Sequence, residues 1–169
     1  FNKASDLSLN LYENIIDAQD LNPRGIISPI AQSAFLYYRY RLDGTFMEDG
    51  RWVNRIEVIP KRKSDPVFSG YIFIQDSTWR SHSADLMITK ESQLEFVDSL
   101  QVKVTYIPVS STEDIWMTGS VNYEFIFDAF GFYGAGNFIG IWSNYDVQTV
   151  HGKKHFRGGI MKINKDANR

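Results

Sequence analysis

A chain of 169 residues is long enough to bury one apolar core, and its lack of cysteine excludes disulfides, thiolate catalysis and cysteine metal sites. The net charge of −2 is unevenly placed. Residues 151–169 hold six Lys or Arg and one acid, whereas residues 1–150 hold 12 basic and 19 acidic side chains. An acidic body argues against nucleic acid as the main partner.

Aromatic residues make up 15% of the chain, which is typical of β-structure and of surfaces that meet apolar ligands. No run of 18 or more apolar residues occurs, so we expect no helical membrane span. The chain begins at Phe1 without Met and without a signal-like segment. We therefore expect a processed form or an excised fragment.

Two short helices are predicted before the strands begin. Residues 6–18 place Leu11 and Ile15 four apart on one stripe, as in an amphipathic helix. After a turn at residues 22–25, Ser28 suits an N-cap and Pro29 the first position of a second helix.

From Phe35 onward, apolar and polar side chains alternate, which predicts seven or eight strands. One face of the first strand is expected to carry Leu36, Tyr38, Tyr40, Leu42 and Phe46. Tight turns between neighbours make the strands antiparallel, in meander order. Turns are expected at residues 48–50 and 76–78, and a polar loop at residues 110–114.

The central hairpin is predicted at residues 55–75, where two strand-forming runs flank a polar break. Proline cannot donate to a strand ladder, so Pro60, Pro66 and Pro108 should mark strand ends. The glycine-rich segment from residue 130 to 141 is predicted to be a tight turn into a last strand.

The apolar face of this sheet is too wide for two short helices to seal. We therefore expect a mainly β fold in which a strongly curved antiparallel sheet, a half-barrel, has the short N-terminal helices covering its concave face. This single domain should span residues 1–150, followed by a basic C-terminal tail or linker at residues 151–169.

No residue pattern indicates catalysis, because the chain has no Gly-x-Ser-x-Gly elbow and no acid stands out by its context. His151 and His155 have a metal-ligand spacing, but the lysines between them would repel a cation. His82 is expected to be a core or rim side chain, and the basic run 61–63 a solvated hairpin tip or a phosphate contact. We expect no catalytic residue, no metal and no cofactor.

A cleft between the sheet and the helices is the hypothetical ligand site. Its expected lining is one set of apolar and aromatic side chains that alternate along the strands. These are Tyr38, Tyr40, Trp52, Ile56, Val58, Phe68, Ile72, Ile74, Leu86, Ile88, Val104 and Tyr106.

Five segments carry a family resemblance: SPI at 28–30, YYRYRL at 37–42, IPKRK at 59–63, DPVFSG at 65–70 and DSL at 98–100. On these the chain resembles large outer-membrane proteins of Bacteroidetes, in which a carboxypeptidase-regulatory-like domain precedes a domain of unknown function and a membrane domain. The resemblance implies a location on the periplasmic side of the outer membrane. It also implies neighbouring domains in the same polypeptide, with the basic tail approaching the membrane.

More distantly, IEVIP at 56–60 and GYIFI at 70–74 resemble the LolA-like lipoprotein-localisation carriers. Those carriers imply a half-open antiparallel sheet whose cavity holds acyl chains. We therefore expect a non-enzymatic, envelope-associated binding module for a lipid acyl chain or another hydrophobic ligand. The alternatives are a structural spacer or docking domain of a larger outer-membrane protein, and a hydrolase that uses scattered carboxylates.

Overall fold

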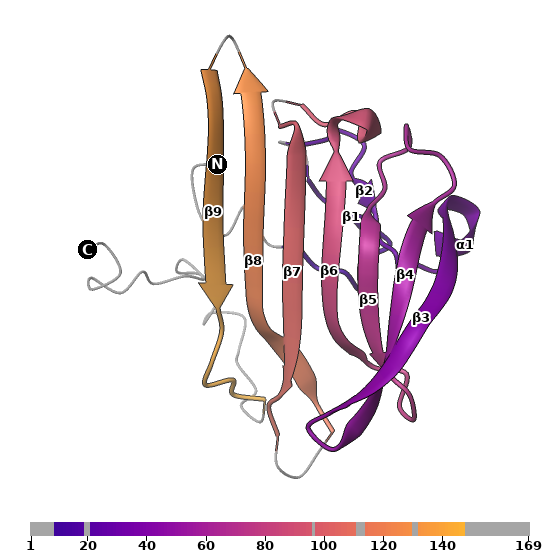
Figure 1. Cartoon of the computed structure of the whole chain (residues 1–169). Coiled ribbons are helices and arrows are strands. Elements are labelled where there is room, and N and C mark those ends of the chain that lie inside the picture. Colours follow the sequence, from indigo (N-terminus) through magenta and orange to yellow (C-terminus); the bar gives the residue numbers. More distant parts are fainter. Residues whose placement is uncertain (1–8, 19–20, 96, 111–113, 130–131, 148–169) are drawn as a thin grey trace, which may run out of the picture.

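A computed structural model describes residues 9–18, 21–95, 97–110, 114–129 and 132–147. These residues form one open antiparallel sheet of seven strands, backed by the N-terminal segment (Figure 1). Neighbours in sequence are neighbours in the sheet, so the predicted mainly β meander is confirmed. The strands are β3 Tyr38–Glu48, β4 Arg51–Pro60, β5 Ser69–Gln75, β6 Ser81–Thr89, β7 Ser99–Pro108, β8 Trp116–Ala129 and β9 Phe132–Ile141.

The central strands follow the alternation of the sequence closely. In β7 the buried side chains of Leu100, Val102 and Val104 point to one face, while Lys103 and Thr105 are exposed on the other. Proline ends two of the strands as predicted, since Pro60 is the last residue of β4 and Pro108 the last of β7. The predicted central hairpin is the β4–β5 pair, with Val58 opposite Gly70.

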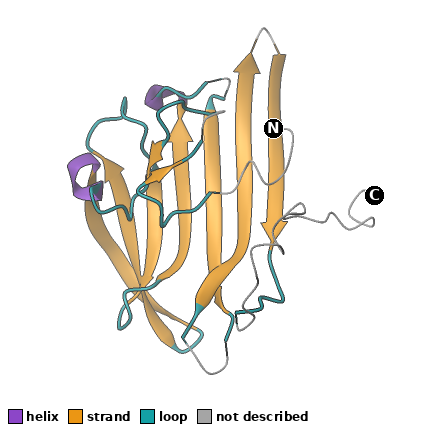
Figure 2. Ribbon diagram, turned by 180° about the vertical axis from the view of Figure 1, so that it is seen from behind, coloured by secondary structure: helices purple, strands orange, loops and turns teal. Residues whose placement is uncertain are grey.

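The N-terminal segment covers the apolar face in a largely extended conformation. It contains the two-residue strands β1 (Ile15–Ile16) and β2 (Ile26–Ile27) and the single helical turn α1 (Ala34–Tyr37). Figure 2 shows this segment running across the back of the strands as loops. Its buried side chains complete one core with the sheet; they are Leu11, Ile16, Leu21, Ile26, Ile27, Ala31 and Ala34.

The prediction of two N-terminal helices is therefore wrong. Residues 9–18 form turns and β1, and residues 6–8 lie outside the described part of the chain. The helix expected from Ser28 is reduced to α1. Pairing of Ile15 with Ile27 buries Ile16 and Ile26 almost completely, and this burial outweighs the weak helix preference of a β-branched pair.

The expected strongly curved half-barrel is also wrong, because the sheet is open and neither closed nor strongly curled. The prediction assumed helices as the only cover, and a helix advances about 1.5 Å per residue. An extended chain advances about 3.3 Å per residue, so the same length of chain reaches across twice as many strands. Sealing the face therefore does not require the sheet to wrap around itself.

Two local predictions about the strands are corrected as well. A bulge between Leu42 and Gly44 shifts the register of β3, so Phe46 lies opposite Val53 and against Phe73 rather than with Tyr38. The glycine-rich segment from Phe132 onward is not a turn but β9 itself. The prediction of a separate tail at residues 151–169 falls outside the described residues.

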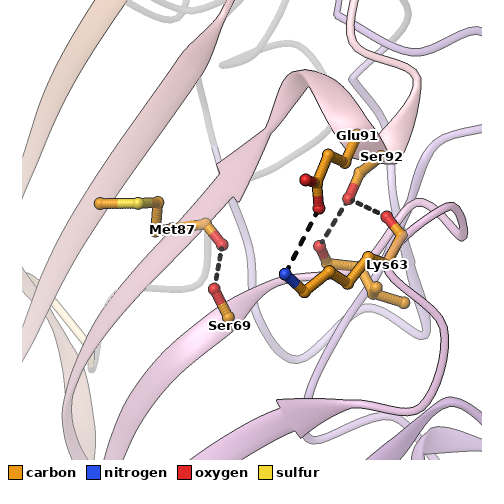
Figure 3. A network of polar contacts seen from close by, with 6 residues as sticks. Lys63, Ser69, Met87, Glu91 and Ser92 are labelled. Carbon is orange, nitrogen blue, oxygen red and sulfur yellow. Dashed lines mark hydrogen bonds and ion pairs between the residues drawn. The ribbon is translucent and has the colours of Figure 1, made fainter.

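Polar contacts tie two loops at one end of the sheet to each other (Figure 3) and to the N-terminal segment. The Ser92 hydroxyl donates to the carbonyls of Lys63 and Val67, and the Lys63 ammonium lies 3.6 Å from a Glu91 carboxylate oxygen. From the N-terminal segment, the Asn22 amide donates to the carbonyls of Ser92 and Gln93. These contacts fix the N-terminal segment to the β4–β5 and β6–β7 loops.

Tyr38 fixes the same segment to the first strands. Its side chain is 1% exposed, and its hydroxyl donates to the Ile27 carbonyl at 2.5 Å and accepts from the Phe68 amide at 3.1 Å. The Ile27 amide in turn donates to the Pro66 carbonyl. One buried hydroxyl thus joins β2, β3 and the start of β5.

We predict that Tyr38→Phe destabilises the fold by about 1–3 kcal/mol, because it leaves a buried carbonyl and a buried amide without their partner. Chemical denaturation followed by circular dichroism measures the free energy of unfolding. Tyr133→Phe is the matched control, since that side chain is 74% exposed, and it should leave the stability unchanged. Equal stability of both variants would show that the Tyr38 hydroxyl does not hold the segment.

Candidate functional site

The structure places nine of the twelve expected cleft residues in the closed core beneath the N-terminal segment. These nine are Tyr38, Val58, Phe68, Ile72, Ile74, Leu86, Ile88, Val104 and Tyr106. Tyr40 and Ile56 are partly buried at its margin, and Trp52 is 53% exposed. The alternation of apolar and polar residues along the strands thus identified side chains that lie together on one face of the sheet. The N-terminal segment packs against that face.

The described part of the cover runs from β8 to beside β3. The Tyr123 hydroxyl of β8 accepts from the Leu9 amide at 3.1 Å, and Tyr12 packs edge-on against Tyr106 of β7. At the other side, the Tyr40 hydroxyl of β3 donates to the Pro29 carbonyl at 2.6 Å. The described segment therefore spans β3 to β8 and leaves β9 outside its cover.

Burial raises the pKa of the tyrosine hydroxyls that hold this cover. It raises the pKa of Tyr40 and of Tyr123 to about 12, and that of Tyr38 further still. These groups are neutral at physiological pH. Their role is to donate and accept hydrogen bonds, not to exchange protons.

The apolar face continues past the cover as a group of aromatic side chains on β8, on β9 and just after it. We call this group the aromatic end. Phe125 and Phe127 stack with ring centroids 6.4 Å apart, and Phe138 lies 6.1 Å from Tyr123. Phe132 is 75% exposed and Trp142 37%. The aromatic end consists of Phe125, Phe127, Phe132, Phe138 and Trp142.

Glycines in β9 make room for these rings. Gly134 lies opposite Phe127, and Gly136 lies opposite Phe125. A Cβ added at Gly136 would come within 2.2 Å of the Phe125 Cζ atom, and one at Gly134 within 2.3 Å of the Phe127 Cζ atom. The far end of each ring therefore lies over the backbone of the opposite glycine, in space that a side chain would fill.

The opposite face of the sheet carries charged side chains that are paired across strands. Arg41 meets Glu57 at 2.5 Å, and Lys103 lies 3.6 Å from Glu124. The Gln101 amide donates to Asp85. These acids are held by basic or amide partners in the ladder, an arrangement that stabilises a solvated sheet face.

The remaining candidates from the sequence have structural partners. His82 lies 3.9 Å from Glu48, and the Lys61 ammonium donates to the Phe35 carbonyl. Within the described ranges, no group of three His, Cys, Asp or Glu side chains is placed to hold a metal ion. His151 and His155 lie outside those ranges. Arg80 and Trp116 lower the pKa of Asp114 by donating hydrogen bonds to its carboxylate.

The expected site did not include the aromatic end, although the sequence contains a signal for it. Phe125 and Phe127 lie two apart, and Gly134 and Gly136 repeat that spacing after a short break. Pairing the two runs as a hairpin about residues 130–131 would have set each phenylalanine opposite a glycine. The prediction of a turn over the glycine-rich segment hid this register.

The described residues form a seven-stranded antiparallel meander whose apolar face is covered by the N-terminal segment. The chain belongs to the family of unknown function DUF5686, whose family model matches residues 1–145. No curated protein and no solved structure matches the chain. In the described part of the chain, no helix is long and apolar enough to cross a membrane.

We predict that Gly136→Ala destabilises the protein by roughly 1–2 kcal/mol, because the new methyl group must push the Phe125 ring off the sheet. Urea unfolding measures the change. Gly44→Ala is the control, since nothing lies within 4 Å of a Cβ at that position, and it should be neutral or slightly stabilising. If Gly136→Ala is as stable as Gly44→Ala, the ring does not rest on the glycine.

Proposed function

We propose that this chain is a non-enzymatic binding module that holds a hydrophobic ligand, such as a lipid acyl chain, against its aromatic end. The observation that carries the proposal is the continuation of the apolar face beyond the described part of its own cover. Contiguous exposed apolar side chains on a folded domain mark binding surfaces far more often than scattered ones do.

Contacts at the margin of the cover support this position. Trp116, Phe125 and Phe138 are partly buried against the core, so the aromatic end is continuous with the packed interior. An acyl chain lying there would extend that core by one more layer. Burial of each additional methylene is worth about 0.8 kcal/mol.

A docking domain of a larger protein is the second candidate, and a specific observation favours it. Nine of the twelve expected cleft residues are already buried by the chain's own N-terminal segment. The interior is therefore filled over most of the sheet, and the aromatic end would then contact a neighbouring domain. Paired charges on the polar face support either candidate over a hydrolase.

The location and partners of the module belong to the same proposal. We place it in the cell envelope, on the periplasmic side of an outer membrane, with neighbouring domains in the same polypeptide. This placement rests on the resemblance of five short segments, including IPKRK at residues 59–63. Cell fractionation with an antibody to the chain tests it.

The ligand proposal predicts saturable binding of cis-parinaric acid, a fluorescent fatty acid, with a dissociation constant of about 1–10 μM. Trp142→Glu should weaken binding at least about tenfold, because it puts a carboxylate on the aromatic end. Ile126→Glu is the matched control, since Ile126 is 39% exposed against 37% for Trp142 but lies on the polar face of β8. It should leave binding within about twofold.

Two results would contradict the ligand proposal. One is the absence of saturable fluorescence up to about 100 μM fatty acid, which would favour the docking domain. The other is an equal loss of binding in Trp142→Glu and Ile126→Glu, which would place the site away from the aromatic end.

A further inference from the structure

In the part of the chain that the structure describes, nothing pairs with the outer edge of β9. Among the described residues, β9 pairs only with β8, and its sequence FYGAGNFIGI contains no charged residue and no proline. The other edge strand, β3, carries Arg39 and Arg41 and a bulge after Leu42. Charges, prolines and bulges are the devices by which edge strands avoid pairing with another chain. β3 has two of them, and β9 has none.

The hydrogen-bonding pattern shows which backbone groups face this edge. The Trp142 amide donates to the Gly119 carbonyl, in line with the β8–β9 register. Bonds in an antiparallel ladder recur at every second residue, so Gly134, Gly136 and Phe138 bond to β8. The amides and carbonyls of the odd-numbered residues point outward; these are Tyr133, Ala135, Asn137, Ile139 and Ile141.

Apart from Asn137, the side chains of β9 are apolar or aromatic on both faces of the sheet. On the polar face of the sheet, β7 presents Gln101, Lys103 and Thr105, whereas β9 presents Ile139 and Ile141. Ile139 is 56% exposed and Ile141 77%. Strands with apolar side chains on both faces are typical of sheet interiors.

The sequence of β9 is complementary to itself. In an antiparallel pair of two copies centred on Gly136, Phe132 faces Gly140 of the second copy, and Gly134 faces its Phe138. These pairs repeat the phenylalanine-over-glycine contacts that β8 and β9 already make. On the other face Tyr133 meets Ile139, an aromatic–β-branched pair of the kind that stabilises sheets.

We propose that β9 pairs with β9 of a second copy of this chain, antiparallel and centred on Gly136, to form one continuous sheet. The odd-numbered residues then exchange about eight backbone hydrogen bonds across the two-fold axis. Because β9 carries no charge, the pairing brings no like charges together. The axis is normal to the sheet, so the two N-terminal covers lie on the same side.

Sedimentation equilibrium of the 169-residue chain tests the proposal. The mass should rise from 19.5 kDa towards twice that value between about 1 and 200 μM protein. Asn137→Pro removes an outward amide and keeps the backbone bonds to β8, losing there only the side-chain bond from Asn137 to Asn122. Ala135→Lys sets two ammonium groups on the diagonal of the new pair. Each should weaken dimerisation at least about tenfold, and salt should partly restore it in Ala135→Lys.

Met87→Lys is the control, because Met87 is 40% exposed on the same face but lies on β6, away from the edge. It should dimerise like the wild type. Ala135→Lys keeps the test decisive if Asn137→Pro does not fold. A wild-type chain that stays monomeric throughout, or a dimer that persists in Ala135→Lys, would overturn the proposal.

Disulfide formation tests the register, and the chain has no cysteine of its own to interfere. The proposed pairing sets Ala135 opposite Asn137 of the second copy, with Cα atoms about 5.5 Å apart, within disulfide range. A mixture of Ala135→Cys and Asn137→Cys chains should cross-link under mild oxidation, and neither variant alone should. Cross-linking of one variant alone, or none in the mixture, would contradict this register. The result is independent of fatty-acid binding, so either proposal can fail without the other.

Discussion

An extended N-terminal segment packed across the apolar face of the sheet is the contact on which the rest of the structure depends. Its described part supplies seven buried apolar side chains to the core, and the burial of each large one is worth roughly 1.5–3 kcal/mol. Polar contacts determine where it lies: the Tyr38 hydroxyl holds Ile27 at one side, and Asn22 holds the loop carbonyls of Ser92 and Gln93. An open sheet can then have a closed interior.

The same cover explains why the two ends of the sheet differ. It spans β3 to β8, so the alternation of apolar and polar side chains is strictest in the central strands, which have one face buried and one in water. Past Tyr123 the described part of the face is closed by rings lying over glycines, as Phe125 lies over Gly136. Within the described residues, β9 therefore has the least cover from the N-terminal segment and an unpaired outer edge. The proposed ligand surface and the proposed self-pairing edge arise from this one feature.

Much of the sheet could be predicted from the sequence because strand alternation and proline positions are local signals. Pro60 and Pro108 end strands as expected. The two-residue period of apolar side chains predicts the core residues from Val58 to Val104. The N-terminal segment could not be predicted this way, since the helix-like spacing of Leu11 and Ile15 was overridden by tertiary contacts with the sheet. The bulge after Leu42 and the strand through Gly134 depend on the register between neighbouring strands. The sequence of one strand by itself does not reveal that register.

Native-state hydrogen exchange tests the covering role of the N-terminal segment most directly. The Ile27 amide, which donates to the Pro66 carbonyl, and the Phe68 amide, which donates to Tyr38, should exchange only by global unfolding, together with the central amides of β5 to β7. Exchange of the Ile27 amide within seconds, while the β5–β7 amides stay protected, would contradict the account. The sheet would then be stable without its cover.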